Sequence, residues 1–177
     1  IVKFRAKEDK DTWYIVWTTT PWTLPSNLCL AVHAETAYVK VRDKKTAELR
    51  IIAKKRLHFL YPFPKGKNCF PEGDSPYEVI ETFLGEVLRG KKYEPLFDYF
   101  LGNKNSFQIT CANFVTTEEG TGIVHQAPAY GEDDFYTCKE LQIDLVDPID
   151  DSGHFDWNIP DFEGVYFKDA DKLICKK

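Results

Sequence analysis

The sequence predicts a mainly β fold with a few helices, an α+β class in which short strands close fully or partly into a β-barrel-like domain. Short runs rich in β-branched and aromatic residues recur along the 177 residues, and clusters of Gly, Pro, Asn and Asp separate them. Segments with helical spacing are scarce. An apolar fraction of 43% is sufficient for one buried core, so residues 1–177 are expected to form a single domain.

Seven runs have the composition of strands. In chain order they cover residues 13–18, 28–33, 38–41, 49–52, 77–82, 107–111 and 122–126. Pro21 ends regular pairing after the first run, because proline donates no backbone hydrogen bond. Turns are expected at residues 25–27, 65–68 and 101–103, which contain Pro, Gly or Asn.

Two segments have a helical pattern. Residues 133–141 begin with acidic side chains, carry Lys139 near their end and place apolar residues at helical spacing. Residues 54–61 are long enough for two turns. Residues 148–155 have the composition of a turn, and residues 162–171 are expected to lead the chain out of the domain.

Composition limits the class of protein. The chain begins at Ile1 and contains no methionine, which suggests a piece of a longer polypeptide, although a trimmed initiator would look the same. No apolar run approaches the roughly 20 residues of a membrane helix. The five cysteines are scattered and form no C-x-x-C pair, which favours neither a disulfide framework nor a zinc knuckle. Such thiols fit a reducing compartment, so a cytoplasmic location is expected.

The net charge of −5 argues against a strongly basic surface that coats nucleic acid. Contact through a local basic cluster stays open. Residues 54–56 with Lys65 and Lys67 form one candidate, and residues 89–92 form another. Such clusters are more often solvated faces than phosphate sites.

The most distinctive motif is residues 17–27, WTTTPWTLPSN, directly after the first predicted strand. On a strand, Thr18 and Thr20 point to one face and Thr19 to the other. Where Pro21 breaks the strand, all three hydroxyls can approach one ligand. Each hydroxyl both donates and accepts a hydrogen bond, which suits the positioning of a carbonyl group or a water. The alternative is that these threonines only fit a half-buried sheet.

A second motif, residues 120–128, supplies glycines and a histidine. Gly120 and Gly122 allow close approach of the backbone at the start of a strand. Asp134 follows His125 by nine positions, near the start of the predicted helix. A helix N-terminus favours negative charge, so this carboxylate is expected to stay ionised and to receive a ligand ammonium group.

These residues also fit other interpretations. His125 alone is more often a packed, hydrogen-bonded side chain, and a run of acidic residues is more often a helix start without a ligand. A metal site that uses His125, Asp133 and Asp134 matches no standard zinc spacing. A nucleophilic site is weaker still, since no local signature surrounds Cys29, Cys111 or Cys138.

Residues 18–27, 120–128 and 131–134 together closely resemble the editing domain, connective peptide 1, of isoleucyl-tRNA synthetases. The resemblance runs from about residue 13 to residue 172. The valine and leucine enzymes carry an arginine after two threonines in the first motif, and Thr20 and Trp22 here fit the isoleucine type instead. The signatures of the class I synthetic core, His-Ile-Gly-His and Lys-Met-Ser-Lys-Ser, are absent, so this chain is not expected to activate amino acids.

Residues 91–100 look like the eukaryotic cytosolic branch of these enzymes. The resemblance implies hydrolysis of valine that is misattached to the isoleucine tRNA. Isoleucine differs from valine by one methylene, and isoleucyl-tRNA synthetase is the standard example of how poorly one pocket resolves that difference. The implied partners are the tRNA(Ile) 3′ end and the rest of the synthetase. No cofactor, no membrane and a monomeric domain are expected, with ATP and Mg²⁺ used only by the synthetic core.

The resemblance also implies residue roles. Asp134 matches the aspartate that holds the α-ammonium group, with Asp133 beside it. Thr18, Thr19 and Thr20 match the threonines around the ester, Trp22 a wall for the valine methyls, and His125 the residue that crowds isoleucine. Thr23 and Asn27 match positions near the pocket. The alternatives are a module that binds the tRNA end or a partner without catalysis, and an editing domain for valyl or leucyl enzymes.

Overall fold

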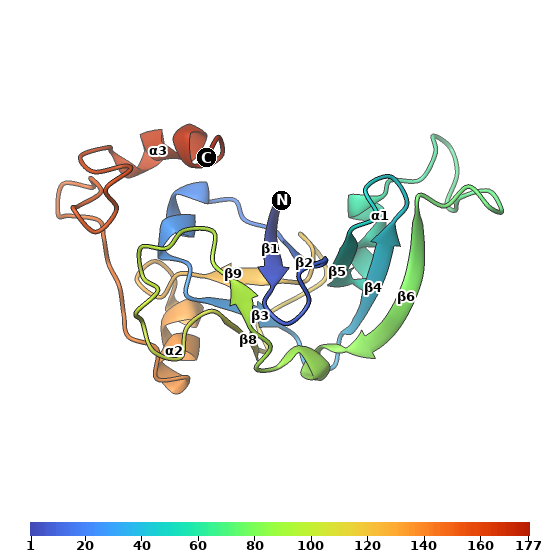
Figure 1. Cartoon of the computed structure of the whole chain (residues 1–177), viewed down its shortest axis with the longest axis horizontal. Helices are drawn as coiled ribbons and strands as arrows, with labels where there is room; N and C mark the ends of the chain where they lie inside the picture. The colour runs from blue at the N-terminus through green and yellow to red at the C-terminus, as the bar shows by residue number, and fades with distance from the viewer.

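The structure is a computed structural model that describes residues 1–177. Its strands form two sheets (Figure 1), one of six strands in the order β6-β4-β5-β2-β1-β7 and one of three in the order β8-β3-β9. The larger sheet contains β1 (Val2–Ala6), β2 (Thr12–Val16), β4 (Ala37–Asp43), β5 (Leu49–Ala53), β6 (Tyr77–Leu84) and β7 (Tyr93–Glu94). The smaller sheet contains β3 (Cys29–Val32), β8 (Gln108–Cys111) and β9 (Val124–Gln126).

The helices are short. They are α1 (Leu57–Leu60), α2 (Glu132–Glu140), α3 (Phe167–Ile174) and the 3₁₀ segments η1 (Pro21–Ser26), η2 (Lys54–Arg56) and η3 (Gly85–Leu88). None of the helices is both long and apolar enough to cross a membrane.

The mainly β class with few helices is confirmed. All seven predicted strands are present, with ends within two residues of the expected ones, and the helix expected at 133–141 is α2. The helix expected at 54–61 is divided into η2 and α1. The strands β1 and β7 and the helix α3 were not predicted.

The closed barrel is not formed. β6 and β7 are edges of the larger sheet, and β8 and β9 are edges of the smaller one. Two isolated β-bridges connect the two sheets. Trp17, directly after β2, pairs with Val124 of β9, and Lys92, directly before β7, pairs with Gln108 of β8. The pairing therefore stops before it can close.

The main core lies between the two sheets. It is built from 19 buried residues, and Phe4, Tyr14, Leu30 and Ile109 are at most 5% exposed. Burial of this apolar surface is the main force that holds the sheets together. A second cluster of five buried residues, which includes Ile15 and Ile52, packs on the other face of the larger sheet with side chains of α1.

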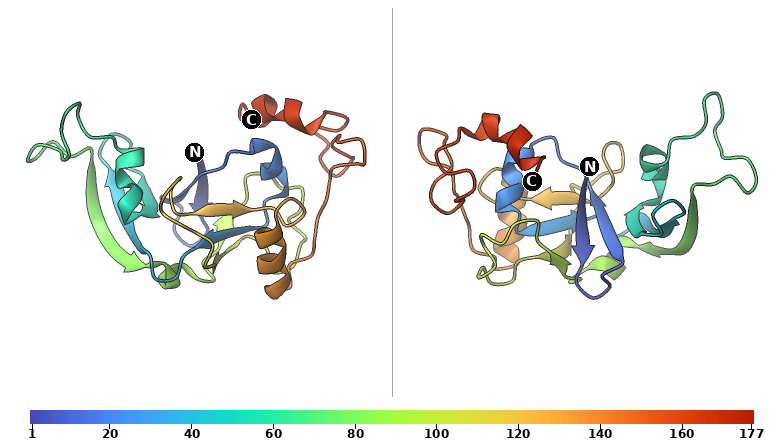
Figure 2. Two further views of the ribbon diagram at one scale, coloured as in Figure 1. Left: turned by 180° about the vertical axis from the view of Figure 1, so that it is seen from behind. Right: turned by 45° about the horizontal axis from the view of Figure 1, so that its top comes forward.

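The C-terminal segment returns to the threonine-rich motif. α3 packs against η1, although the two lie at opposite ends of the chain (Figure 2). The ring of Trp22 lies between Tyr130 and Phe167, with centroid distances of 4.8 and 4.6 Å. The backbone N–H of Trp22 donates a hydrogen bond to Oδ1 of Asp171 at 2.8 Å. This contact anchors η1 to the last helix.

Candidate functional site

The two sequence motifs meet in one cleft. Trp17 pairs with Val124 in a parallel bridge, directly after β2 and at the start of β9. The cleft has a volume of about 210 Å³. It is lined by Trp17, Thr18, Thr19, Thr20, Thr23, Val124, His125, Ala127, Tyr130 and Asp134.

The glycines of the second motif allow this approach. A Cβ atom on Gly122 would lie 2.4 Å from Cβ of Ala53, and Gly122 has a φ of +76°. A Cβ atom on Gly120 would lie 2.8 Å from the ring of Trp17. Both positions therefore need glycine, as the sequence predicted.

The threonine hydroxyls lie on one side of the cleft. The backbone N–H of Thr20 donates to Oγ1 of Thr18 at 3.1 Å, and the hydroxyls of these two threonines are 3.4 Å apart. Thr19 also lines the cleft and is exposed. Because the strand ends before Pro21, hydroxyls that would alternate on a strand line the same space.

His125 is held on the buried side of the cleft and is 7% exposed. Its Nε2 lies 2.8 Å from Oγ1 of Thr23, and its Nδ1 lies 3.4 Å from Nδ2 of Asn27. Burial lowers the pKa of His125 to about 4, because the charged form loses its hydration. The imidazole is neutral at neutral pH.

Asp134 lies in the first turn of α2 and lines the cleft. Its Oδ2 accepts the backbone N–H of Ala127 at 2.9 Å, and its Oδ1 accepts Nε2 of Gln126 at 3.2 Å. Burial raises the pKa of Asp134 above its ordinary value, the Ala127 N–H opposes this, and the charge of Asp133 adds to it. The expectation from the helix N-terminus was an ionised carboxylate, and desolvation acts on the pKa of Asp134 in the direction opposite to the helix N-terminus.

Three of the predicted residues do not line the cleft. The ring of Trp22 packs against Tyr130 and Phe167 and does not line the cleft, and its role as a wall for a ligand stays a prediction. Asp133 is exposed on α2 and lies outside the lining. Asn27 is buried behind His125 and reaches the cleft only through that ring.

Tyr130 was missed, and its ring packs against that of Trp22. It lines the cleft, and its hydroxyl donates to Oδ1 of Asp147 at 2.9 Å. Burial raises the pKa of this hydroxyl, so it stays protonated. Its position between the second motif and Gly131 was the only sequence signal for it.

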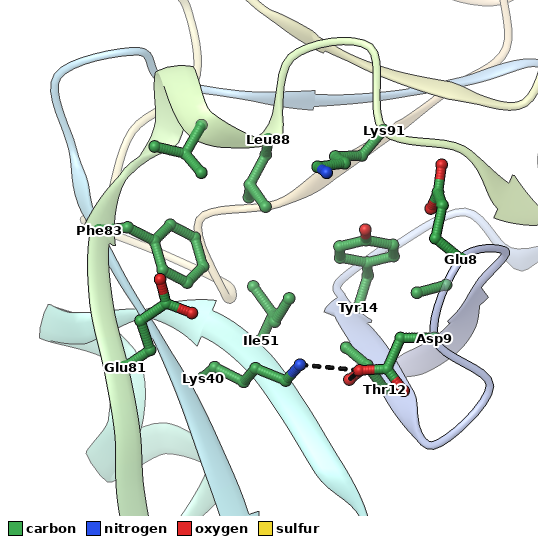
Figure 3. Close-up of a pocket in the computed structure, with 12 residues that line it drawn as sticks. Glu8, Asp9, Thr12, Tyr14, Lys40, Ile51, Glu81, Phe83, Leu88 and Lys91 are labelled. Carbon is green, nitrogen blue, oxygen red and sulfur yellow. Dashed lines mark hydrogen bonds and ion pairs between the residues drawn. The ribbon is translucent and has the colours of Figure 1, made fainter.

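Another cavity, of about 280 Å³, lies against the larger sheet (Figure 3). Its floor includes Tyr14, Ile51 and Phe83, and Nζ of Lys40 pairs with Oδ2 of Asp9 at 2.8 Å. Glu8, Glu81 and Lys91 also line it, but neither sequence motif contributes to this cavity. The threonine cleft is therefore the better candidate site.

No protein-family model matches the chain. An isoleucine–tRNA ligase from Tetrahymena thermophila is 46% identical over 99% of the chain. An isoleucine–tRNA ligase from Bdellovibrio bacteriovorus is 44% identical over 98% of the chain. A cytoplasmic isoleucine–tRNA ligase from Mus musculus is 44% identical over 99% of the chain. The chain belongs with the isoleucine–tRNA ligases. It spans only 16%, 16% and 14% of the length of these three relatives.

Solved structures show which part of a synthetase this fold corresponds to. The editing domain of the P. falciparum cytosolic leucyl-tRNA synthetase matches 97% of the chain and 68% of that domain, with a TM-score of 0.58 and 13% identity. A leucyl-tRNA synthetase CP1 structure, GlLeuRS-CP1, matches 73% of the chain and 44% of that structure, with a TM-score of 0.55 and 14% identity. This isoleucine–tRNA ligase segment thus has the fold of a synthetase editing domain. Bacterial and eukaryotic ligases match it about equally, so the eukaryotic cytosolic subtype stays a prediction.

Proposed function

We propose that this chain is the editing domain of an isoleucine–tRNA ligase and hydrolyses the ester of valine misattached to tRNA(Ile). The observation that carries the proposal is the convergence of three threonines and Asp134 on one small cleft, in a chain homologous to isoleucine–tRNA ligases over its whole length. A cleft with a few convergent polar groups is the usual form of a small-ligand site.

Asp134 is proposed to hold the α-ammonium group. Each of its carboxylate oxygens accepts one hydrogen bond from the protein, so each keeps capacity for a second. An ammonium group placed there would also favour the ionised carboxylate and so offset the pKa increase that burial causes. Binding of a positively charged ligand and ionisation of Asp134 would therefore favour each other.

The reaction is proposed to be a direct hydrolysis. Water attacks the ester carbonyl carbon, the bond to the ribose oxygen breaks, and that oxygen leaves with a proton, giving free valine and uncharged tRNA. The hydroxyls of Thr18 and Thr19 position the ester and the water. The free hydroxyl of the terminal ribose assists the attack, because no side chain in the cleft is placed as a dedicated base.

Selectivity is proposed to follow from size. His125, with bonds to Thr23 and Asn27, forms a fixed floor that leaves room for valine but crowds the extra methylene of isoleucine. Hydrolysis consumes only water. ATP and Mg²⁺ would serve the synthetic core, which lies outside this chain. Most contacts with the tRNA would also be made outside this chain. The reaction would take place in the cytoplasm.

The test is deacylation of Val-tRNA(Ile) and Ile-tRNA(Ile) by the chain and by a full-length ligase that carries it. Faster loss of valine than of isoleucine in both supports the proposal. Loss of valine by the full-length enzyme alone would place tRNA delivery outside the chain and leave the chemistry in the cleft. Binding of the tRNA end without hydrolysis in either would favour the non-catalytic module.

A further inference from the structure

A row of buried polar side chains runs from the core to the floor of the cleft. The hydroxyl of Tyr93 donates to Oδ1 of Asn27 at 2.7 Å. Nδ2 of Asn27 faces Nδ1 of His125 at 3.4 Å, and Nε2 of His125 faces Oγ1 of Thr23 at 2.8 Å. Tyr93, Asn27, His125 and Thr23 are 1%, 4%, 7% and 4% exposed. Water therefore cannot replace these partners, and each bond constrains the next.

The core end of this row fixes the orientation of the Asn27 amide. Nδ2 of Asn27 donates to the carbonyl oxygen of Cys29 at 3.0 Å, and a carbonyl can only accept. Oδ1 consequently faces the Tyr93 hydroxyl, whose pKa is raised well above its ordinary value by burial, so it stays a donor. The remaining Asn27 N–H points at His125, and Nδ1 must present a lone pair.

The cleft end assigns the same proton position independently. The hydroxyl of Thr23 donates its one proton to the carbonyl oxygen of Thr20 at 2.8 Å. Its Oγ1 can therefore only accept from Nε2 of His125, which must carry the proton. The hydroxyl of Thr20, 3.4 Å from Oγ1 of Thr23, can add a second donor to the same oxygen. Both ends agree on the Nε2–H tautomer.

We propose that Tyr93 is a positioning residue: through Asn27 it holds His125 as the Nε2–H tautomer, with its ring fixed at the cleft floor and its proton committed to Thr23. The role assigned to the ring in editing rests on the proposed function. In this arrangement His125 has no lone pair in the cleft, so it takes no proton from the attacking water. It acts as a rigid wall and keeps the Thr23 hydroxyl bonded to the Thr20 carbonyl.

The hydrogen bond to Asn27 is the contact that links the Tyr93 hydroxyl to the cleft. Its ring packs edge-on against Phe4 and Phe107, with centroid distances of 5.2 and 6.1 Å, and its hydroxyl bonds only to Asn27. Tyr93→Phe keeps the ring and removes only the hydroxyl. The Asn27 Oδ1 then loses its donor, and the amide is held by Cys29 alone. The Thr23 bond remains and only the Asn27 support of the tautomer is weakened, so we expect the Nδ1–H tautomer of His125 to appear as a minor form.

The direct test is long-range ¹H–¹⁵N NMR of the imidazole nitrogens in the labelled chain at neutral pH. The signals of His125 are assigned by their loss in His125→Gln. We expect one neutral form with the proton on Nε2, and a proton on Nδ1 would overturn the proposal. This spectrum needs no other variant, so it decides the tautomer even if Tyr93→Phe does not fold.

The spectrum of Tyr93→Phe is then compared with that of Tyr14→Phe. Tyr14 is a similarly buried tyrosine, 3% exposed, at the other cavity. We expect mixed or exchange-broadened His125 signals only in Tyr93→Phe. Signals identical to the wild type in that variant would overturn the proposal.

Hydrolysis of Val-tRNA(Ile) gives the second readout. Tyr93→Phe should lower kcat roughly ten-fold with little change in KM, because a positioning contact is lost and no substrate contact is removed. An unchanged kcat would show that the tautomer does not matter for editing. If neither the wild-type chain nor the wild-type full-length ligase hydrolyses Val-tRNA(Ile), the proposed function fails, while the spectra still decide whether Tyr93 sets the tautomer.

Discussion

The backbone N–H of Trp22 donates a hydrogen bond to Oδ1 of Asp171 across 149 residues of sequence, at 2.8 Å. The side chain of Thr20, the residue before η1, makes no capping hydrogen bond. Asp171 of α3 instead supplies the acceptor for the Trp22 N–H. A carboxylate at the start of a helical turn satisfies a free N–H and matches its partial positive charge. The last helix thereby anchors the start of η1, which directly follows Thr18, Thr19 and Thr20.

Asp171→Ala should destabilise the chain by about 1–2 kcal/mol, since a part-buried N–H loses its carboxylate acceptor. Asp171→Asn keeps an oxygen acceptor and removes only the charge, so it should retain most of the stability. Urea unfolding of the three proteins measures both effects. Equal stability of Asp171→Ala and the wild type would show that the contact does not anchor η1.

The pKa of His125, lowered to about 4, predicts a loss of stability in acid. Between about pH 6.5 and pH 4 the unfolded chain binds a proton at this residue that the folded chain does not, so the free energy of unfolding falls as pH falls. The full contribution is about 3 kcal/mol. Asp134 has the opposite sign, because its raised pKa makes the folded chain keep a proton to higher pH.

The difference in unfolding free energy between the wild type and His125→Gln isolates the histidine from Asp134. It should shrink from pH 7 to pH 4, since glutamine does not titrate. Parallel curves for the two proteins over this range would mean that the imidazole is solvated in the folded state.

Gly122→Ala should destabilise the chain by more than 2 kcal/mol, because the new methyl group would lie 2.4 Å from Cβ of Ala53 in a left-handed backbone conformation. Gly164→Ala is the matched control, with a φ of +75° and nothing within 4 Å, and should cost only about 1 kcal/mol. Thermal unfolding measures both. The double variant Gly122→Ala with Ala53→Gly should recover the difference, and a failure to recover would point to backbone strain alone.

His125→Ala should make the hydrolysis of Ile-tRNA(Ile) measurable, because removal of the ring enlarges the floor of the cleft. Discrimination between the two amino acids should fall by roughly 10- to 200-fold, the range that one methylene contributes. His58→Ala, at an exposed position outside the cleft, should leave it unchanged. If Ile-tRNA(Ile) stays resistant in His125→Ala, another residue sets the size limit.

Local patterns predicted most of the elements, and long-range contacts account for the misses. Runs such as the one that forms β3 carry enough β-branched and apolar residues to be recognised. β1 was missed although Lys3 and Arg5 alternate with its apolar residues, a pattern that is itself typical of a half-buried strand.

The site was predicted in part for the same reason. Thr18 and Asp134 stand in distinctive local motifs, and the structure brings them to one cleft. The position of Trp22 depends on Phe167 and Asp171, which no local pattern links to it. Likewise the pKa of Asp134 depends on how deeply α2 packs, which is a property of the whole fold.

The most direct test of the central claim compares two adjacent carboxylates. Asp134 lines the cleft, whereas Asp133 is exposed and lies outside it, so Asp133→Ala is a matched control on the same helical turn. In single-turnover deacylation of Val-tRNA(Ile) by the full-length ligase, Asp134→Ala should lower the rate by at least about 100-fold, because a charged contact to the substrate is lost. Asp133→Ala should stay within about two-fold of the wild type. Near-normal hydrolysis by Asp134→Ala, or equal losses in the two variants, would contradict the assignment of this cleft as the editing site.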